Sequence, residues 1–289
     1  MHRVVIYTSL PQEVIITDLD IYFILKTIVI AIVEGITEFL PISSTGHMII
    51  IGRFIEFEGS FEKLFEIFIQ SGAITAIVVL FRKKIFASFK SLHPGGDGFK
   101  LWTNILVALI PTGIVGLLLH EKVTRHLMQP LPVAFALLVG GVWMLFGEKK
   151  YRNDSKRLHI DEVSYKKAFI IGSFQIMAIL WPGFSRSAST IIGGWIVGLT
   201  AITGAEFAFF LAIPTIYSAS IYYLFTHIFI LTTIEIIALA LGFFISFMVA
   251  MVVVEQFINY IKHQSLKGFA YYRICIGALM ILLTLLNII

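Results

Sequence analysis

The stretch PISSTGH, residues 41–47, interrupts an apolar region and decides how the fold is predicted. It follows VEGITEF, residues 33–39, which carries Glu34 and Glu38. Two carboxylates, three hydroxyls and an imidazole thus lie close together between long apolar runs. Non-helical backbone at membrane depth is tolerated only where protein or water surrounds it. The pattern therefore predicts a re-entrant helix pair over about 21–54, broken at Pro41.

The composition of the whole chain is that of an integral membrane protein. Of its 289 residues, 58% are hydrophobic and 14% charged, whereas soluble domains are about 45–50% apolar and about 25% charged. The net charge of +4 comes from basic residues in short loops, where the positive-inside rule places them, so no nucleic-acid partner is expected. Cys275 is the only cysteine, which excludes an intrachain disulfide and a thiolate zinc cluster.

Apolar runs of the length needed to span a bilayer predict an all-α polytopic fold with six transmembrane helices. The predicted spans are 64–81, 101–119, 130–147, 205–223, 234–254 and 270–289. A second broken region, 168–200, is interrupted at Pro182 and Gly183 and is also predicted to be a re-entrant pair.

Basic residues in the loops set the predicted orientation. Segments 82–100, 148–167 and 255–273 are rich in Lys and Arg and are predicted to be cytoplasmic; the third contains Lys262, Lys267 and Arg273. The two broken regions would then enter from opposite faces, which is the layout of an inverted-topology repeat with a site near the midplane.

This layout predicts a single membrane domain, 1–289. Its parts are a tail (1–20, without a signal-peptide pattern), a first repeat (21–147), a cytoplasmic loop (148–167) and a second repeat (168–289). A weak internal similarity agrees with it, since placing Pro41 on Pro182 aligns Glu34 with Gln175 and Ser44 with Ser185.

The first polar cluster has the residue types of a reactive site. Glu34 and Glu38 lie one helical turn apart, and carboxylates at bilayer depth are costly and usually functional. They could share a proton, bind a divalent cation (Mg²⁺ or Ca²⁺) or orient a base, unless they are structural. Ser44 and His47 could form a nucleophile and base pair, whereas Ser43 and Thr45 could also serve only to bond backbone groups freed by Pro41.

The second cluster, WPGFSRSAST at residues 181–190, predicts an anion site. Arg186 is permanently charged and its donors fit phosphate oxygens. Small and hydroxyl residues accompany it, and a following helix N-terminus would add N–H groups: Gly183, Ser185, Ser187 and Thr190. Alternatively, or in the resting site, Arg186 neutralises Glu34 or Glu38 across the repeat interface.

Three long stretches resemble the bacitracin-resistance type undecaprenyl-diphosphate phosphatases of bacteria. They are EGITEFLPISSTGH (34–47), FEIFIQSGAITAIVVLFRKK (65–84) and PGFSRSAST (182–190). The [EQ]xxxE element of the family falls on Glu34 and Glu38, its Ser and His on Ser44 and His47, and the Arg of PGxSRSxxT on Arg186. These are the residues that the resemblance implies are catalytic.

The resemblance further implies hydrolysis of the terminal phosphate of the C55 polyprenyl diphosphate in the bacterial cytoplasmic membrane. The products, phosphate and the monophosphate carrier lipid, would serve peptidoglycan synthesis, with a site opening outward. It also implies bacitracin resistance, because bacitracin sequesters the same diphosphate. The expected partners are this substrate and membrane lipids, and whether the chain forms a homodimer stays open.

Two versions of the attack are compatible with these residues. Either Ser44 is a nucleophile activated by His47, or His47 or a glutamate activates water and Ser44 positions it. The alternative function is a polyprenyl-lipid flippase or ion-coupled transporter, because broken helices at the midplane are also a transporter architecture.

Overall fold

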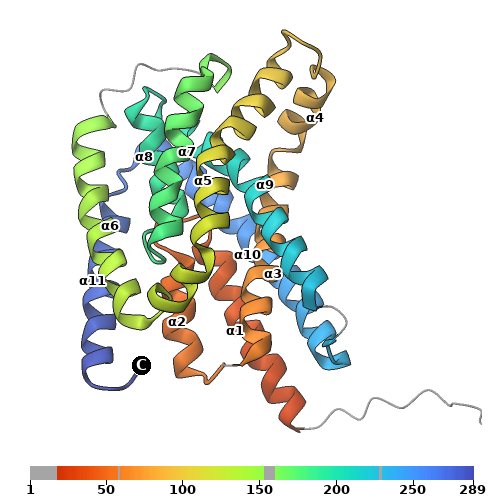
Figure 1. The fold of residues 1–289 in the computed structure, drawn as a ribbon, viewed down its shortest axis with the longest axis vertical. Helices are drawn as coiled ribbons and strands as arrows, with labels where there is room; N and C mark the ends of the chain where they lie inside the picture. The colour runs from red at the N-terminus through yellow and green to blue at the C-terminus, as the bar shows by residue number, and fades with distance from the viewer. Residues whose placement is uncertain (1–17, 58, 153–159, 228–229) are drawn as a thin grey trace, which may run out of the picture.

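The fold is given by a computed structural model that describes residues 18–57, 59–152, 160–227 and 230–289 (Figure 1). These ranges fold into α-helices, one short 3₁₀ helix and connecting loops. In chain order they are α1 (Asp18–Thr37), α2 (Ser44–Phe54), α3 (Ser60–Leu80), α4 (Arg82–Lys90), α5 (Asp97–Leu127), α6 (Pro130–Tyr151), η1 (Ile160–Glu162), α7 (Tyr165–Leu180), α8 (Arg186–Ile196), α9 (Ala201–His227), α10 (Thr233–His263) and α11 (Lys267–Leu285).

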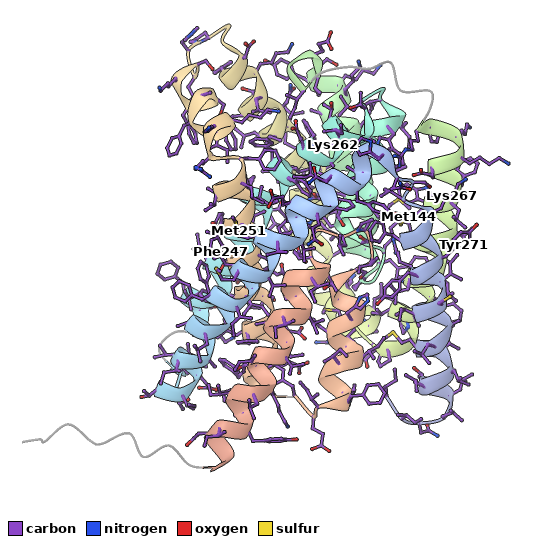
Figure 2. All side chains as sticks on the ribbon, turned by 180° about the vertical axis from the view of Figure 1, so that it is seen from behind. Met144, Phe247, Met251, Lys262, Lys267 and Tyr271 are labelled. Atoms are coloured by element: carbon purple, nitrogen blue, oxygen red, sulfur yellow. The ribbon has the colours of Figure 1, made fainter. Side chains whose placement is uncertain are left out.

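The prediction of six spanning helices is confirmed. Within the described residues, α3, α5, α6, α9, α10 and α11 are long and apolar enough to cross a membrane. Their outward faces are apolar as well, as the exposed Phe244, Met248 and Val252 of α10 illustrate; Figure 2 shows side chains standing out from this helix on the side seen from behind. These apolar outer faces are suited to contact with lipid tails.

Both broken regions form a helix, a short loop and a second helix. The first loop connects α1 to α2 over residues 38–43, and the second connects α7 to α8 over residues 181–185. In Figure 1 the α1–α2 pair lies in the lower half and the α7–α8 pair in the upper half. Their re-entrant nature and the inverted repeat stay predictions. The predicted tail lies mostly outside the described residues, as do residues 153–159 of the predicted cytoplasmic loop.

The helices α2 and α8 begin in the same unusual way. Ser43 caps α2 with φ 71° and its hydroxyl accepts from the N–H of Gly46. Ser185 caps α8 with φ 75° and accepts from the N–H of Ala188. Serine is a favoured N-cap residue because its oxygen satisfies an otherwise free helix N–H. Both caps hold a backbone conformation with positive φ that non-glycine residues rarely adopt.

The two helices also end alike. The N–H of Phe57 donates to the carbonyl of Gly52, and 142 residues later the N–H of Leu199 donates to the carbonyl of Gly194. The caps Ser43 and Ser185 are separated by the same 142 residues. The register predicted from the prolines is therefore corrected by one residue in this part of the chain, because the caps and the closing hydrogen bonds of α2 and α8 both recur at this separation.

The helices of each predicted repeat pack against helices of the other. Helix α1 packs on α10, α7 on α5, α3 on α9 and α6 on α11. The first two contacts are close: a Cβ at Gly35 would lie 2.8 Å from the carbonyl oxygen of Ser246, and one at Gly172 would collide with the carbonyl of Ala108. Each half thus completes the packing of the other, while the predicted domain boundaries stay a prediction.

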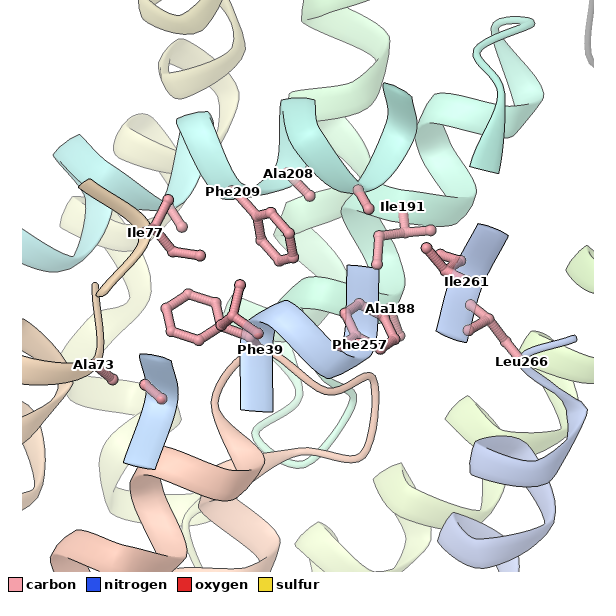
Figure 3. Packing of buried hydrophobic residues seen from close by; sticks show 14 of the residues in the cluster. Phe39, Ala73, Ile77, Ala188, Ile191, Ala208, Phe209, Phe257, Ile261 and Leu266 are labelled. Atoms are coloured by element: carbon pink, nitrogen blue, oxygen red, sulfur yellow. The ribbon is translucent and has the colours of Figure 1, made fainter. Parts of the chain in front are cut away.

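A shared apolar core supports both loops. Phe39 of the first loop and Ala188 of α8 belong to one buried cluster with Phe209 and Phe257 (Figure 3). The rings of Phe39 and Phe209 meet edge to face with centroids 5.7 Å apart, a favoured aromatic geometry. This core fixes the backbone from which the polar side chains of both loops project.

Candidate active site

Glu38 joins the two loops through its two carboxylate oxygens. The hydroxyl of Ser44 donates to Oε2 at 2.6 Å, and the guanidinium of Arg186 donates from Nη2 to Oε1 at 2.8 Å. The Glu38 and Arg186 side chains are largely buried, where such a charge-assisted bond is short and strong. The alternative that Arg186 neutralises one of the acids in the resting site is therefore confirmed, and Glu38 is that acid.

Ser187 forms a second connection between the loops. Its hydroxyl donates to the carbonyl oxygen of Leu40 at 3.0 Å, and its oxygen lies 3.1 Å from the hydroxyl oxygen of Ser185. The sequence placed Ser185 and Ser187 in one phosphate-binding group with Arg186, and the structure does bring these three residues together beside Glu38.

A cavity of about 180 Å³ lies where the two loops meet. The loops and the first turns of α2 and α8 supply its predicted lining residues: Glu38, Ser43, Ser44, Thr45, Gly183, Ser185, Arg186 and Ser187. Gln70 of α3 and Thr215 of α9 also line it, although the sequence did not single them out as site residues. The second guanidinium nitrogen of Arg186, Nη1, has no hydrogen-bond partner within the described residues, so one strong donor is uncommitted.

Glu34 lies apart from this cavity. It is 0% exposed and does not line the cavity, and it interacts with the carboxyl group of Glu38 one turn further along the chain. In the described ranges no group of three or more His, Cys, Asp or Glu side chains could hold a metal. That Glu34 and Glu38 together hold a cation stays a prediction, and of the two only Glu38 lines the cavity.

The predicted pairing of His47 with Ser44 is also wrong for this structure. His47 Nδ1 lies 2.7 Å from the carbonyl oxygen of Ser43, and Nε2 lies 2.8 Å from the hydroxyl of Tyr272 in α11. Both ring nitrogens are thus engaged, and the group that receives the Ser44 hydroxyl hydrogen is Glu38. Spacing alone could not show this, since His47 sits on the first turn of α2 and its ring points toward α11.

Thr190 does not line the cavity either. Its hydroxyl donates to the carbonyls of Arg186 at 2.9 Å and Ser187 at 3.2 Å. A threonine hydroxyl bonded back to its own helix is satisfied locally. Its predicted role in phosphate binding is therefore replaced by a local role in the first turn of α8.

Arg273 is a site-supporting residue that sequence reasoning misplaced. It was counted with a cytoplasmic loop, but α11 begins at Lys267 and Arg273 is 0% exposed inside the protein. Its Nη2 donates to the carbonyls of Gly183 at 3.0 Å and Phe184 at 2.8 Å in the second loop. The available signal was the apolar run that follows directly, ICIGALMILL at residues 274–283, because an arginine joined to such a run is a candidate for burial.

The atoms around the cavity that could coordinate a metal are oxygens, which are the ligands that Mg²⁺ and Ca²⁺ prefer. Glu38 offers a carboxylate, and Ser44 and Thr45 offer hydroxyls. Magnesium sites often use one or two carboxylates together with substrate phosphates. The cavity residues therefore fit a hard divalent cation that arrives with a phosphate substrate, although Arg186 occupies one Glu38 oxygen in this structure.

Comparisons with known proteins agree with this chemistry. The family described as bacitracin resistance protein BacA matches residues 27–279. An undecaprenyl-diphosphatase of Thermoanaerobacter pseudethanolicus is 50% identical over 260 residues, covering 90% of this chain and 96% of that protein. An undecaprenyl-diphosphatase of Clostridium novyi is 48% identical, covering 93% and 99%. Undecaprenyl-diphosphatase 2 of Clostridioides difficile is 43% identical, covering 94% and 99%.

Proposed function

Since the chain belongs to the bacitracin resistance protein BacA family, we propose that the cavity between its two loops is the active site of an undecaprenyl-diphosphate phosphatase. The enzyme is a multi-pass membrane hydrolase that removes the terminal phosphate of undecaprenyl diphosphate. The observation that carries the assignment of the site is the arrangement of Ser44, Glu38 and Arg186, in which one carboxylate holds a hydroxyl and a guanidinium together.

Arg186 is the residue that binds the diphosphate. One of its terminal nitrogens donates to Glu38 and the other, which is buried, has no hydrogen-bond partner among the described residues, while the side chain as a whole lines the cavity. The hydroxyls of Ser185 and Ser187 and the first N–H groups of α8 add neutral donors beside it. Fixed donors of this kind stabilise the charge that develops in phosphoryl transfer.

Ser44 is the nucleophile in the version of the reaction that the geometry favours. Its oxygen attacks the terminal phosphorus, its hydrogen passes to Glu38 Oε2, and the bond between phosphorus and the bridging oxygen breaks. Undecaprenyl phosphate leaves, and water then hydrolyses the phosphoserine to give phosphate and free Ser44. The contact of 2.6 Å between Ser44 and Glu38 supports this assignment, in which Glu38 takes the role that the sequence gave to His47.

A divalent cation, Mg²⁺ or Ca²⁺, is part of the proposal. Glu38 and the nearby hydroxyls would hold it together with the substrate. When bound, it supplies neutralisation of the charge on the diphosphate oxygens. Of the two acids, Glu38 is the one that lines the cavity.

The cellular role follows from the product. We propose that the enzyme works in the bacterial cytoplasmic membrane with its site open to the outer face. Release of the monophosphate carrier lipid would support cell-wall synthesis, and removal of the diphosphate would lower sensitivity to bacitracin. The basic residues of α4 and of the end of α6 support this orientation, since both lie at the end of the molecule that holds the start of α7 (Figure 1).

The test is phosphate release from undecaprenyl diphosphate by purified protein, with a metal titration. Ser44→Ala should lower kcat by about 10³-fold, because the nucleophile is lost. Stopping a single turnover of the unaltered enzyme with acid should trap phosphoserine at position 44. Full activity of Ser44→Ala would exclude Ser44 as nucleophile and would favour direct attack by water.

The same assay separates the enzyme from the alternative function. A lipid flippase or ion-coupled transporter would bind the polyprenyl lipid but release no phosphate. Such a result in protein that still binds the substrate would overturn the proposed function and leave the cavity as a transport site.

A further inference from the structure

Two adjacent residues of α11 hold the two loops of the site. The hydroxyl of Tyr272 lies 2.8 Å from His47 Nε2 in α2, and Arg273 donates to the carbonyls of Gly183 and Phe184 in the second loop. Neither Tyr272 nor Arg273 lines the cavity. One turn of α11 therefore contacts the first turn of α2 and the second loop from outside the space that a substrate would occupy.

The hydrogen bonds of His47 fix which nitrogen carries its hydrogen. Nδ1 lies 2.7 Å from the carbonyl oxygen of Ser43, and a carbonyl can only accept, so Nδ1 carries a hydrogen. A neutral imidazole has one N–H, which leaves Nε2 as an acceptor. Nε2 therefore receives the hydroxyl hydrogen of Tyr272, and this bond stabilises the form of His47 that bonds to Ser43.

The ring of Tyr272 also restrains His47 by stacking. The two ring centroids lie 5.5 Å apart and the planes differ by 7°, so the contact fixes the orientation of the imidazole as well as its hydrogen bond. His47 is consequently held from both nitrogens and from one face.

The group that His47 holds is the strained residue of the first loop. Ser43 has φ 71° and caps α2, and a non-glycine residue keeps such a conformation only where its surroundings enforce it. Ser44 follows directly, and its hydroxyl donates a hydrogen bond to Glu38. A change in the peptide of Ser43 would redirect the Ser44 hydroxyl, and small displacements of reacting groups are costly to catalysis.

We propose that Tyr272 is a positioning residue of this enzyme, acting through His47 on the Ser43 peptide and so on the direction of the Ser44 hydroxyl. The inference rests on the proposed function for its effect on rate. It assigns His47 to positioning as well, in place of the base predicted from the sequence. Tyr272 and Arg273 together fix the position of the first turn of α2 relative to the second loop.

The activity test compares two neighbouring tyrosines. Tyr272→Phe keeps the stacked ring and removes the hydroxyl, and it should lower kcat about tenfold with KM changed less than about twofold, because the loss is one hydrogen bond outside the cavity. Tyr271→Phe is the control. Tyr271 is 57% exposed and lies on the outside of α11 (Figure 2), so the kcat of this variant should equal that of the unaltered enzyme. Equal kcat values for both variants would overturn the proposal.

Two substitutions of His47 separate positioning from base catalysis. The amide nitrogen of Asn can replace Nδ1–H, whereas that of Gln lies nearer the place of Nε2. Under the proposal His47→Asn keeps the bond to Ser43 and retains at least about tenfold more activity than His47→Gln. A base acting through Nε2 would be lost in both variants, so equally low activity would overturn the proposal.

A spectroscopic measurement tests the same contact without reference to activity. In histidine labelled with ¹⁵N, the unaltered protein should show His47 protonated at Nδ1 only, with His47→Asn identifying the signal. Tyr272→Phe should move the Nε2 resonance, because this nitrogen loses its hydrogen-bond donor, while Nδ1 stays protonated through its bond to the Ser43 carbonyl. An unchanged spectrum would overturn the proposal, whereas absence of phosphatase activity with the expected spectra would overturn only the proposed function.

Discussion

The first and second loops share a backbone design and differ in chemistry. Each leads into an eleven-residue helix capped by a serine with positive φ, Ser43 or Ser185, and the helices end with matching hydrogen bonds. At the first position of these helices, Ser44 stands in one and Arg186 in the other. The two similar loops thus bring the hydroxyl of Ser44 from one side and the guanidinium of Arg186 from the other to the same carboxylate.

The residues behind the loops show the same contrast. Glu34 in α1 and Gln175 in α7 are both buried. Of these two positions, the acid stands in the half that also carries Glu38 and Ser44. Where the loops meet, the first half contributes the carboxylate of Glu38 and the second the guanidinium of Arg186, so opposite charges come together.

The largest effect is expected where the halves differ most. Arg186→Ala removes the cation that the second loop contributes and should lower kcat/KM by about 10³-fold, as the loss of a group that stabilises transition-state charge does. Arg186→Lys should recover part of this, because it restores the charge without the planar fork. Phosphate release measures both, and Arg125→Ala at the exposed end of α5 is the control. Activity of Arg186→Ala within about tenfold of the unaltered enzyme would contradict the assignment.

The next effect distinguishes the two acids of the first half. Glu38→Gln should lower kcat by about 10²-fold, because the amide cannot accept the Ser44 hydrogen as a base. Glu34→Gln should stay within about tenfold of the unaltered enzyme, since it does not line the cavity. The pair is compared in the same release assay. A loss in Glu34→Gln as large as that in Glu38→Gln would show that Glu34 takes part in the reaction.

The smallest effect tests the feature that the halves share. Ser43→Ala and Ser185→Ala each remove a cap and should each destabilise the folded protein by about 1 kcal/mol. Ser43→Gly and Ser185→Gly should be milder, because glycine tolerates positive φ. Thermal unfolding of the purified proteins in one detergent gives all four values. Clearly unequal losses for the two alanine variants would show that the caps are not equivalent.

Much of the fold could be predicted from local patterns. Six runs of about 20 apolar residues correspond to six long helices, and Pro41 and Pro182 mark the two breaks. These features depend on the energy of moving each segment into lipid and on the backbone chemistry of proline, both of which are local. The proline alignment was nevertheless one residue out for the caps, since the number of residues between a proline and the next helix differs between the halves.

The site was predicted in its residue types but only partly in its contacts. Glu38, Ser44 and Arg186 were selected because buried charge and reactive hydroxyls are rare in lipid. The partner of Ser44 was predicted to be His47 and is Glu38. The direction of a side chain depends on the loop backbone. Nothing in the sequence indicates that Ser43 adopts a positive φ.

By itself, the sequence determined that this chain spans a membrane, where its helices break and which polar residues stand at the breaks. Only the tertiary structure decided that Glu34 lies behind the site, that His47 is bound to Tyr272 and that Arg273 is buried beneath the second loop. The reason is physical: the free energy of transferring a segment into lipid is a sum of contributions from its residues, and these can be read along the chain. Hydrogen bonds that join the first loop to α8, and α11 to α2 and the second loop, depend in contrast on distances and directions that exist only after the two halves have packed together.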